Sequence, residues 1–173
     1  ARDIAERKRA EEVLRNMSLT DPLTGVYNRR GAITLAEQQL KVAQRLGRTL
    51  LIVYADLNHL KQINDTHGHT AGDAALLEVA EVLQETFRES DIIARIGGDE
   101  FVVLAMETTD VDENTLRRRL LDALTFRNAR GARPFDLSLS IGIARFDPER
   151  ARAFEELMGE ADRRMYEDKR IKR

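Results

Sequence analysis

The chain has 173 residues, 42% of them hydrophobic, and a net charge of −2 from 28 Lys and Arg against 30 Asp and Glu. This composition is typical of one soluble domain with a sizeable core, and the balanced charge argues against a nucleic-acid polymer or a membrane surface as partner. The absence of cysteine excludes disulfides and thiolate metal sites, and without a long apolar run or a signal peptide we expect a cytoplasmic protein.

Residues 1–17 are mostly good helix formers with mixed charges and only a thin apolar stripe. We expect a linker or signalling helix here rather than a core element, although no clean heptad establishes a coiled coil. The segment from Ser18 to Gly25 places Asp21 before a proline and ends in glycine, which indicates a cap followed by a short turn. We therefore place the globular domain at residues 18–173.

Apolar spacing in the remaining chain alternates between helical and strand-like periods. In order, the pattern predicts a helix over 31–46, a buried strand over 49–55 that ends in Asp56, a short helical stretch, a loop over 66–69, a helix over 73–87, strands over 91–96 and 101–106, a helix around 116–124, a half-buried strand over 135–143 and a last helix from 154. This order indicates an α/β sandwich (α+β), in which helices flank a mostly antiparallel central sheet.

The hairpin between the two middle strands carries the most informative motif, Arg-Ile-Gly-Gly-Asp-Glu-Phe at residues 95–101. Two glycines between β-branched runs indicate a tight turn, which puts Asp99 and Glu100 at the hairpin tip at a sheet edge. Neighbouring strands lie only about 5 Å apart, so Asp56 could join them and hold Mg²⁺, a cation that prefers oxygen ligands. The alternatives are a solvated polar turn for the motif and a helix cap for Asp56.

Two further polar clusters have both a functional and a simpler explanation. The first cluster lies between residues 64 and 73. Turn and capping chemistry explains some of its residues, and its histidines lack the third soft ligand of a zinc site. A solvated helix end, favoured by the helix dipole, is the alternative for the basic C-terminus. The first cluster comprises Asn64, Asp65, His67, His69 and Asp73, and the second comprises Lys169 to Arg173.

From residue 19 to residue 173 these motifs, in this order, resemble the GGDEF-domain diguanylate cyclases. The matching stretches are Asp21 to Arg30, Asp56 to Asp65, Gly68-His69 with Gly72-Asp73, Arg95 to Phe101, Ser140-Ile141-Gly142, and Ala161-Asp162 with Met165-Tyr166 and Lys169. The resemblance implies a fold similar to the class III nucleotidyl cyclases and the polymerase palm. It also implies an enzyme that joins two GTP molecules into cyclic di-GMP.

Position by position, the resemblance assigns roles to specific residues. The implied metal ligands for Mg²⁺, with Mn²⁺ as an alternative, are Asp56, the carbonyl of Leu57, Asp99 and Glu100. The implied catalytic residues are Asp99, as acceptor of the 3′-hydroxyl proton, with Glu100 and Lys61. The implied substrate-binding residues are His59, Leu60, Lys61, Asn64, His69, Asp73, Gly98, Lys169 and Arg173, among which Asn64 and Asp73 would read guanine. An inhibitory site for the product would use Arg88 and Asp91 with Arg119, although an isolated Arg-x-x-Asp is more often a surface ion pair.

The resemblance also implies partners, and the sequence departs from the family pattern at two positions near the predicted metal site. Each domain would hold one GTP, so a second copy must face it, and residues 3–11 resemble the exit from a PAS sensor domain. Asn58 stands where many relatives carry a second aspartate and Leu60 where they carry phenylalanine, for which we expect tuning rather than loss. The alternative function is a non-catalytic module that binds GTP or cyclic di-GMP, and a pure scaffold ranks below both.

Overall fold

The computed structural model describes residues 1–108 and 111–172. The helices and strands are α1 (Arg2–Met17), α2 (Arg29–Leu46), β1 (Leu50–Leu57), α3 (Leu60–His67), α4 (His69–Thr86), β2 (Ile92–Arg95), β3 (Glu100–Met106), α5 (Glu113–Arg130), β4 (Leu139–Phe146), the 3₁₀ turn η1 (Pro148–Arg150) and α6 (Phe154–Ile171). This order confirms the predicted sequence of elements, with shifts at several boundaries.

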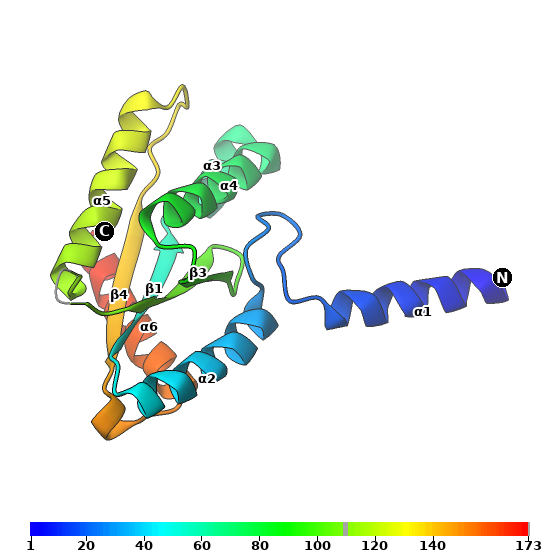
Figure 1. The fold of residues 1–173 in the computed structure, drawn as a ribbon. Helices are drawn as coiled ribbons and strands as arrows, with labels where there is room; N and C mark the ends of the chain where they lie inside the picture. The colour runs from blue at the N-terminus through cyan, green and yellow to red at the C-terminus, as the bar shows by residue number, and fades with distance from the viewer. Residues whose placement is uncertain (109–110, 173) are drawn as a thin grey trace.

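A four-stranded sheet in the order β2-β3-β1-β4 forms the centre, and its strands pair antiparallel. Helices α4 and α5 cover one face, and α2 and α6 cover the other (Figure 1). The alternating side chains of β1 divide between the two hydrophobic clusters, so all eight of its residues are buried. The predicted α/β sandwich with an antiparallel sheet is confirmed.

The hairpin tip lies at the end of the two central strands, because β3 and β1 are neighbours in the middle of the sheet. In the β1–β3 register Asp56 stands directly opposite Glu100. Leu57 also donates its backbone N–H to the carbonyl of Asp99 at 2.8 Å. This register brings together two motifs that are separated by more than forty residues of sequence.

The prediction of a half-buried strand over 135–143 was wrong in both position and burial. Strand β4 begins at Leu139, the residue that pairs with the last residue of β1, so the chain before it has no strand partner. Its small residues face α6 rather than solvent. A Cβ at Gly142 would lie 1.9 Å from the carbonyl oxygen of Ala161, so the alternation of large and small residues reflects the close approach of a helix.

The predicted loop over 66–69 and helix over 73–87 also need correction. Helix α3 continues to His67, and α4 already begins at His69. Gly68 alone separates the two helices, and its φ of 89° is a conformation that glycine adopts at little cost. The first turn of α4 therefore precedes the predicted start of this helix at residue 73.

Both lateral edges of the sheet are covered. At the β2 edge, residue Tyr27 forms a parallel bridge with Ala94 and exchanges backbone hydrogen bonds with Ile93 and Arg95. At the β4 edge, side chains bond the outward backbone groups: Asp168 accepts from the N–H of Ile141, while Arg117, Arg164 and Lys172 donate to the carbonyls of Ile141, Ile143 and Leu139. These contacts reduce the number of unpaired edge groups that could template pairing with another strand.

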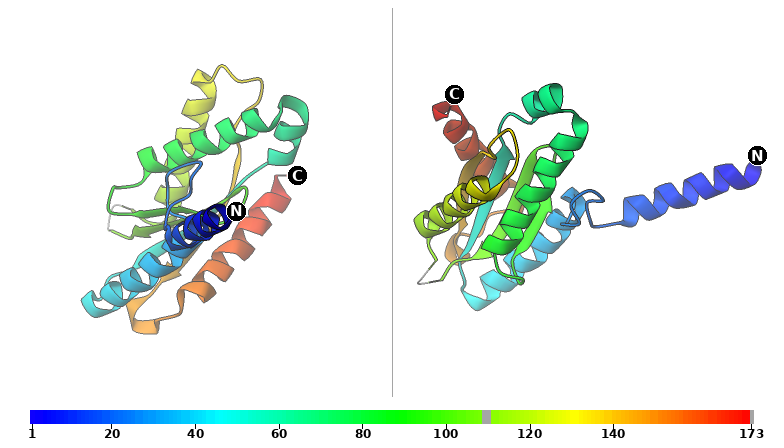
Figure 2. Two further views of the ribbon diagram at one scale, coloured as in Figure 1. Left: turned by 90° about the vertical axis from the view of Figure 1, so that its right-hand side faces the viewer. Right: turned by 90° about the horizontal axis from the view of Figure 1, so that it is seen from above.

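Helix α1 projects away from the sheet and its covering helices, as Figure 1 and the right-hand view of Figure 2 show. Its apolar side chains Ile4, Val13, Leu14 and Met17 are all more than half exposed. None of the helices in the described ranges is long and apolar enough to cross a bilayer.

Candidate active site

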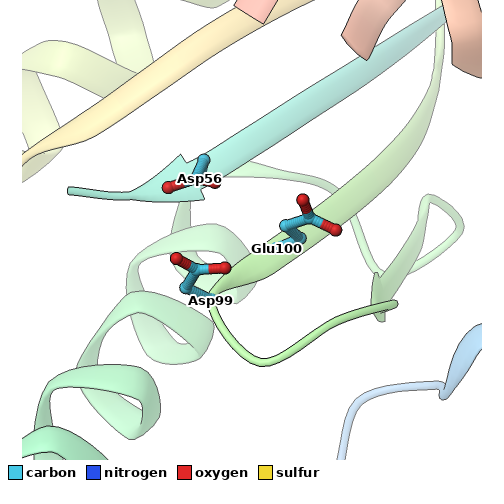
Figure 3. A group of neighbouring side chains, drawn as sticks. All are labelled: Asp56, Asp99 and Glu100. Atoms are coloured by element: carbon cyan, nitrogen blue, oxygen red, sulfur yellow. The ribbon is translucent and has the colours of Figure 1, made fainter. Parts of the chain in front are cut away.

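Three carboxylates meet where β1 ends and β3 begins. Asp56 comes from β1, Glu100 is the first residue of β3, and Asp99 closes the hairpin loop before it. One oxygen from each lies within 4.8 Å of the others, and the side chains stand around a common space (Figure 3). The acids that the sequence predicted to converge therefore do lie together.

Asp56 is the most buried of the three, with 4% of its surface exposed. Burial, reinforced by the negative charge of Asp99, raises the pKa of its carboxyl group to about 6, although Lys169 opposes the shift. The Nζ of Lys169 lies 3.2 Å from Asp56 Oδ1 and is the cation that α6 contributes. The cluster thus holds more negative charge than one lysine neutralises, and its all-oxygen donor set fits a hard divalent cation such as Mg²⁺.

Glu100 is fixed in place by two neighbours. The hydroxyl of Tyr54, on β1, donates a hydrogen bond to Glu100 Oε2 at 2.9 Å. Burial, together with the hydrogen bond and charge of Glu100, raises the pKa of Tyr54 above its ordinary value, so the phenol remains a donor. The second neighbour is Gly97, the first glycine of the motif. A side chain at this position would place its Cβ only 2.7 Å from the same oxygen, so the glycine leaves room for the carboxylate.

A pocket of about 480 Å³ opens beside the acids. The residues that line it are Asn58, His59, Leu60, Lys61, Asp99, Ser138, Lys169 and Lys172. Four predicted substrate-binding residues, at positions 59–61 and 169, therefore border one cavity together with Asp99. Three lysines at its wall provide the positive charge that a phosphate chain needs.

The backbone at the entrance to α3 has an unusual conformation. His59 has a φ of 64°, the one positive value among non-glycine residues in the described part of the chain. It joins β1 to α3, so that Leu60 and Lys61 at the helix N-terminus border the pocket. Backbone strain of this kind is often found at binding sites, and the N–H groups of a helix N-terminus attract anions.

Three lining residues were not among the predicted catalytic or substrate-binding residues. Lys172 lies one helical turn after Lys169, so helical spacing could have indicated that both face the same site. Asn58 was noted only as a departure. Its side-chain amide donates to Ser138 Oγ at 2.9 Å and accepts from Ser140 Oγ at 2.8 Å, which ties the end of β1 to β4, and no sequence signal marked Ser138.

The predicted guanine-reading residues lie at the junction of α3 and α4 and do not line this pocket. Asn64 packs so closely on Gly72 that a Cβ there would lie 1.7 Å from its Oδ1. That oxygen is buried and accepts no hydrogen bond within the described residues. Asp73 and His69 are exposed on α4, as is Gly98 in the hairpin loop, and Arg173 lies outside the described residues.

The predicted inhibitory site is a separate pocket of about 420 Å³ at the start of β2. Arg88 and Asp91 both line it, together with the edge segment that contains Tyr27. Asp91 accepts a hydrogen bond from the backbone N–H of Arg88 at 2.9 Å, which leaves the Arg88 guanidinium on the exposed surface. Arg119 is exposed on α5 and does not line this pocket.

An antiparallel sheet between helices, with acids at the ends of two central strands and lysines around the adjoining pocket, is the arrangement that the resemblance to the palm-like nucleotidyl cyclases led us to expect. The class is therefore that of the palm-like α+β domains. Within this class the sequence matches the family described as "Diguanylate cyclase, GGDEF domain" over residues 18–173, and the chain belongs to that family.

Curated relatives and solved structures agree with this assignment. "Probable diguanylate cyclase DgcC" of Escherichia coli K12 is 35% identical over 173 residues, covering 100% of this chain and 46% of that protein. "Cyclic di-GMP phosphodiesterase NbdA" of Pseudomonas aeruginosa is 34% identical, covering 92% of this chain and 20% of that protein. The crystal structure of the GGDEF domain of DgcB from Caulobacter crescentus in complex with c-di-GMP is 26% identical, with a TM-score of 0.79 and coverage of 90% and 92%. The chain thus spans less than half the length of each of these two curated relatives.

Proposed function

We propose that this domain is a diguanylate cyclase, which condenses two GTP into cyclic di-GMP with release of two pyrophosphates. The observation that carries the proposal is the group of Asp56, Asp99 and Glu100, with oxygens within 4.8 Å of one another, beside a lysine-lined pocket. Acids for a divalent cation next to cations for a triphosphate match the charge pattern of a metal-bound nucleotide.

In this proposal the oxygens of Asp56, Asp99 and Glu100 hold Mg²⁺, with the carbonyl of Leu57 as a further ligand. When bound, the cation would neutralise the triphosphate and increase the acidity of a nearby hydroxyl. Lys61 and Lys169 bind the phosphates, and Lys172, which lines the same pocket, joins them. The triphosphate would also give Lys169 a second anionic partner besides Asp56.

Guanine is read by Asn64 and Asp73 in this proposal. A carboxylate at Asp73 accepts the two N–H donors on the Watson–Crick edge of guanine, whereas adenine would present an acceptor there. Such a mismatch leaves polar groups unpaired and discriminates strongly between the bases. The buried Oδ1 of Asn64 accepts no hydrogen bond within the described residues, so in this proposal the side chain turns towards the base and gains one there.

Bond formation needs a second copy of the domain. Each 3′-hydroxyl attacks the α-phosphorus of the nucleotide on the facing copy, and pyrophosphate leaves in line. Asp99 accepts the hydroxyl proton. A lone copy should be inactive because it holds only one of the two nucleotides. The projecting helix α1 and an upstream sensor domain would control how often two copies meet.

The test is to incubate the protein with GTP and Mg²⁺ over a rising range of protein concentration and to quantify cyclic di-GMP. We expect the rate per molecule to increase with concentration, since the active species contains two copies, and Asp99→Ala to abolish product at every concentration. If no product forms even when an artificial dimeriser joins two copies, the domain is not a cyclase.

We further propose feedback inhibition by cyclic di-GMP at the pocket lined by Arg88 and Asp91. An exposed guanidinium can stack on guanine and bind phosphate, and a carboxylate can read the base edge. We expect Arg88→Ala to relieve inhibition by added product while the initial rate stays unchanged. Inhibition that is the same in Arg88→Ala and in the wild type would refute this site.

The second candidate function is a nucleotide-binding module without turnover. It is favoured by the match to a relative whose name describes a phosphodiesterase. In that case the protein would bind GTP or cyclic di-GMP in a titration yet form no product in the assay above. Asp99→Ala would then change the affinity for the nucleotide, and neither the wild type nor the variant would form product.

A further inference from the structure

We propose that Tyr54 is a positioning residue, whose hydroxyl fixes the carboxylate of Glu100 so that this group is presented to the cation shared with Asp56 and Asp99. The inference rests on the metal site proposed above. Tyr54 is not one of the predicted site residues, and its side chain is buried between the sheet and the helices α2 and α6.

The sheet register explains how a tyrosine two residues before Asp56 reaches Glu100. Asp56 and Glu100 are directly opposite each other on β1 and β3, and Tyr54 is opposite Val102. Tyr54, Asp56 and Glu100 therefore share one face, with Tyr54 diagonal to Glu100. Diagonal neighbours are about 7–8 Å apart at the backbone, which an aromatic side chain can span.

Only one oxygen of Glu100 is occupied by this contact. Oε2 accepts the 2.9 Å hydrogen bond from Tyr54, and the same oxygen lies where a Cβ at position 97 would crowd it. The tyrosine hydroxyl thus holds this oxygen, and the absence of a Cβ at Gly97 leaves room for it. The hydrogen bond restrains the carboxylate, and its remaining lone pairs are available to a cation beside the other two acids.

Hydrogen-bond partners of metal ligands act on affinity. Loss of such a partner typically weakens metal binding or activity by about 10–100-fold, because the ligand must then be ordered when the ion binds. Glu100 is only partly buried, so without the tyrosine hydroxyl its side chain would be free to turn towards solvent. We expect a loss within that range for Tyr54→Phe, which removes one oxygen atom and keeps the buried ring.

The experiment measures Mn²⁺ binding to the full chain in the absence of nucleotide, from the electron paramagnetic resonance signal of free Mn²⁺. We expect Tyr54→Phe to raise the Kd for Mn²⁺ at least tenfold. The matched control is Tyr166→Phe on α6, whose side chain is 56% exposed, and its Kd should equal that of the wild type. A Tyr54→Phe variant that binds Mn²⁺ within twofold of the wild type would overturn the inference.

A double-mutant cycle separates positioning from a general effect on folding. In a Glu100→Ala background, Tyr54→Phe should cause no further loss of Mn²⁺ affinity, because the hydroxyl acts through Glu100. An equal loss in both backgrounds would overturn the assignment. Gly97→Ala, which crowds the same oxygen, should also weaken Mn²⁺ binding and gives a second variant should Tyr54→Phe not fold. Wild-type protein that binds no Mn²⁺ would refute both the metal site and this inference.

Discussion

Replacing Asp56 by asparagine should stabilise the metal-free domain while it abolishes metal binding and cyclic di-GMP synthesis. Asp56 is 4% exposed, and its carboxyl group lies beside that of Asp99. The pKa of this carboxyl group is therefore raised from 3.8 to about 6. The folded state therefore disfavours the ionised form. Asparagine has nearly the same shape and carries no charge.

The size of the effect follows from the pKa shift. A shift of about two units corresponds to a penalty of about 3 kcal/mol for the ionised carboxylate at neutral pH. Lys169 loses its partner in the variant, and the new amide needs its own hydrogen bonds, so we expect a net gain of about 1–2 kcal/mol in the free energy of unfolding. For a domain of this size that raises Tm by a few degrees.

The pH dependence has a defined sign. Because the pKa of Asp56 is higher in the folded than in the unfolded state, the folded state binds more protons between pH 4 and 6, and wild-type stability falls as pH rises through this window. The advantage of Asp56→Asn should therefore be largest at pH 8. It should shrink by about 1.5 kcal/mol at pH 5, where much of the penalty is relieved by protonation.

Urea unfolding at pH 8 and pH 5 in the presence of EDTA measures both quantities. Asp122→Asn, at an exposed position on α5, is the matched control and should change neither stability nor its pH dependence. Excess Mn²⁺ should stabilise the wild type and leave Asp56→Asn unchanged. The reasoning would be refuted if Asp56→Asn were less stable than the wild type at pH 8. It would also be refuted if the difference in free energy of unfolding between the two proteins were the same at pH 8 and pH 5.

Two further predictions concern glycines. Gly142→Ala on β4 should lower the free energy of unfolding by about 3 kcal/mol or more in urea titrations, because the new methyl group would lie 1.9 Å from the backbone of Ala161 on α6. The control is Gly159→Ala on α6, which has open space around its Cβ and should be neutral or stabilising. Gly72→Ala should weaken GTP binding on the order of tenfold in calorimetric titrations with little change in stability, because the methyl group displaces the Asn64 amide, and unchanged affinity would contradict the guanine-reading role.

The sequence predicted the helices, the strands and the meeting of the acids because these depend on local patterns. The hairpin motif placed Asp99 and Glu100 at a turn, and the apolar run before Asp56 marked a strand. Antiparallel pairing of neighbouring strands then brings their ends together whatever lies between them in sequence. That is why the acid cluster could be predicted without coordinates.

What the sequence could not predict depends on register and on helix packing. The contact from Tyr54 to Glu100 requires that β1 and β3 pair with a particular offset, and a shift by one residue would send the tyrosine to the other face. The start of β4 was misplaced for a related reason, since the strand begins only where β1 offers a partner. Its small residues indicated solvent exposure when they actually allow the close approach of α6.

The covered sheet edges limit how copies of the domain can associate. Residue Tyr27 occupies the β2 edge, and long polar side chains from α5 and α6 occupy the outward carbonyls of β4. Continuous sheets running from one molecule into the next are thereby disfavoured, which also protects against fibril growth. Encounters between copies are left to helical surfaces and to the ends of the strands.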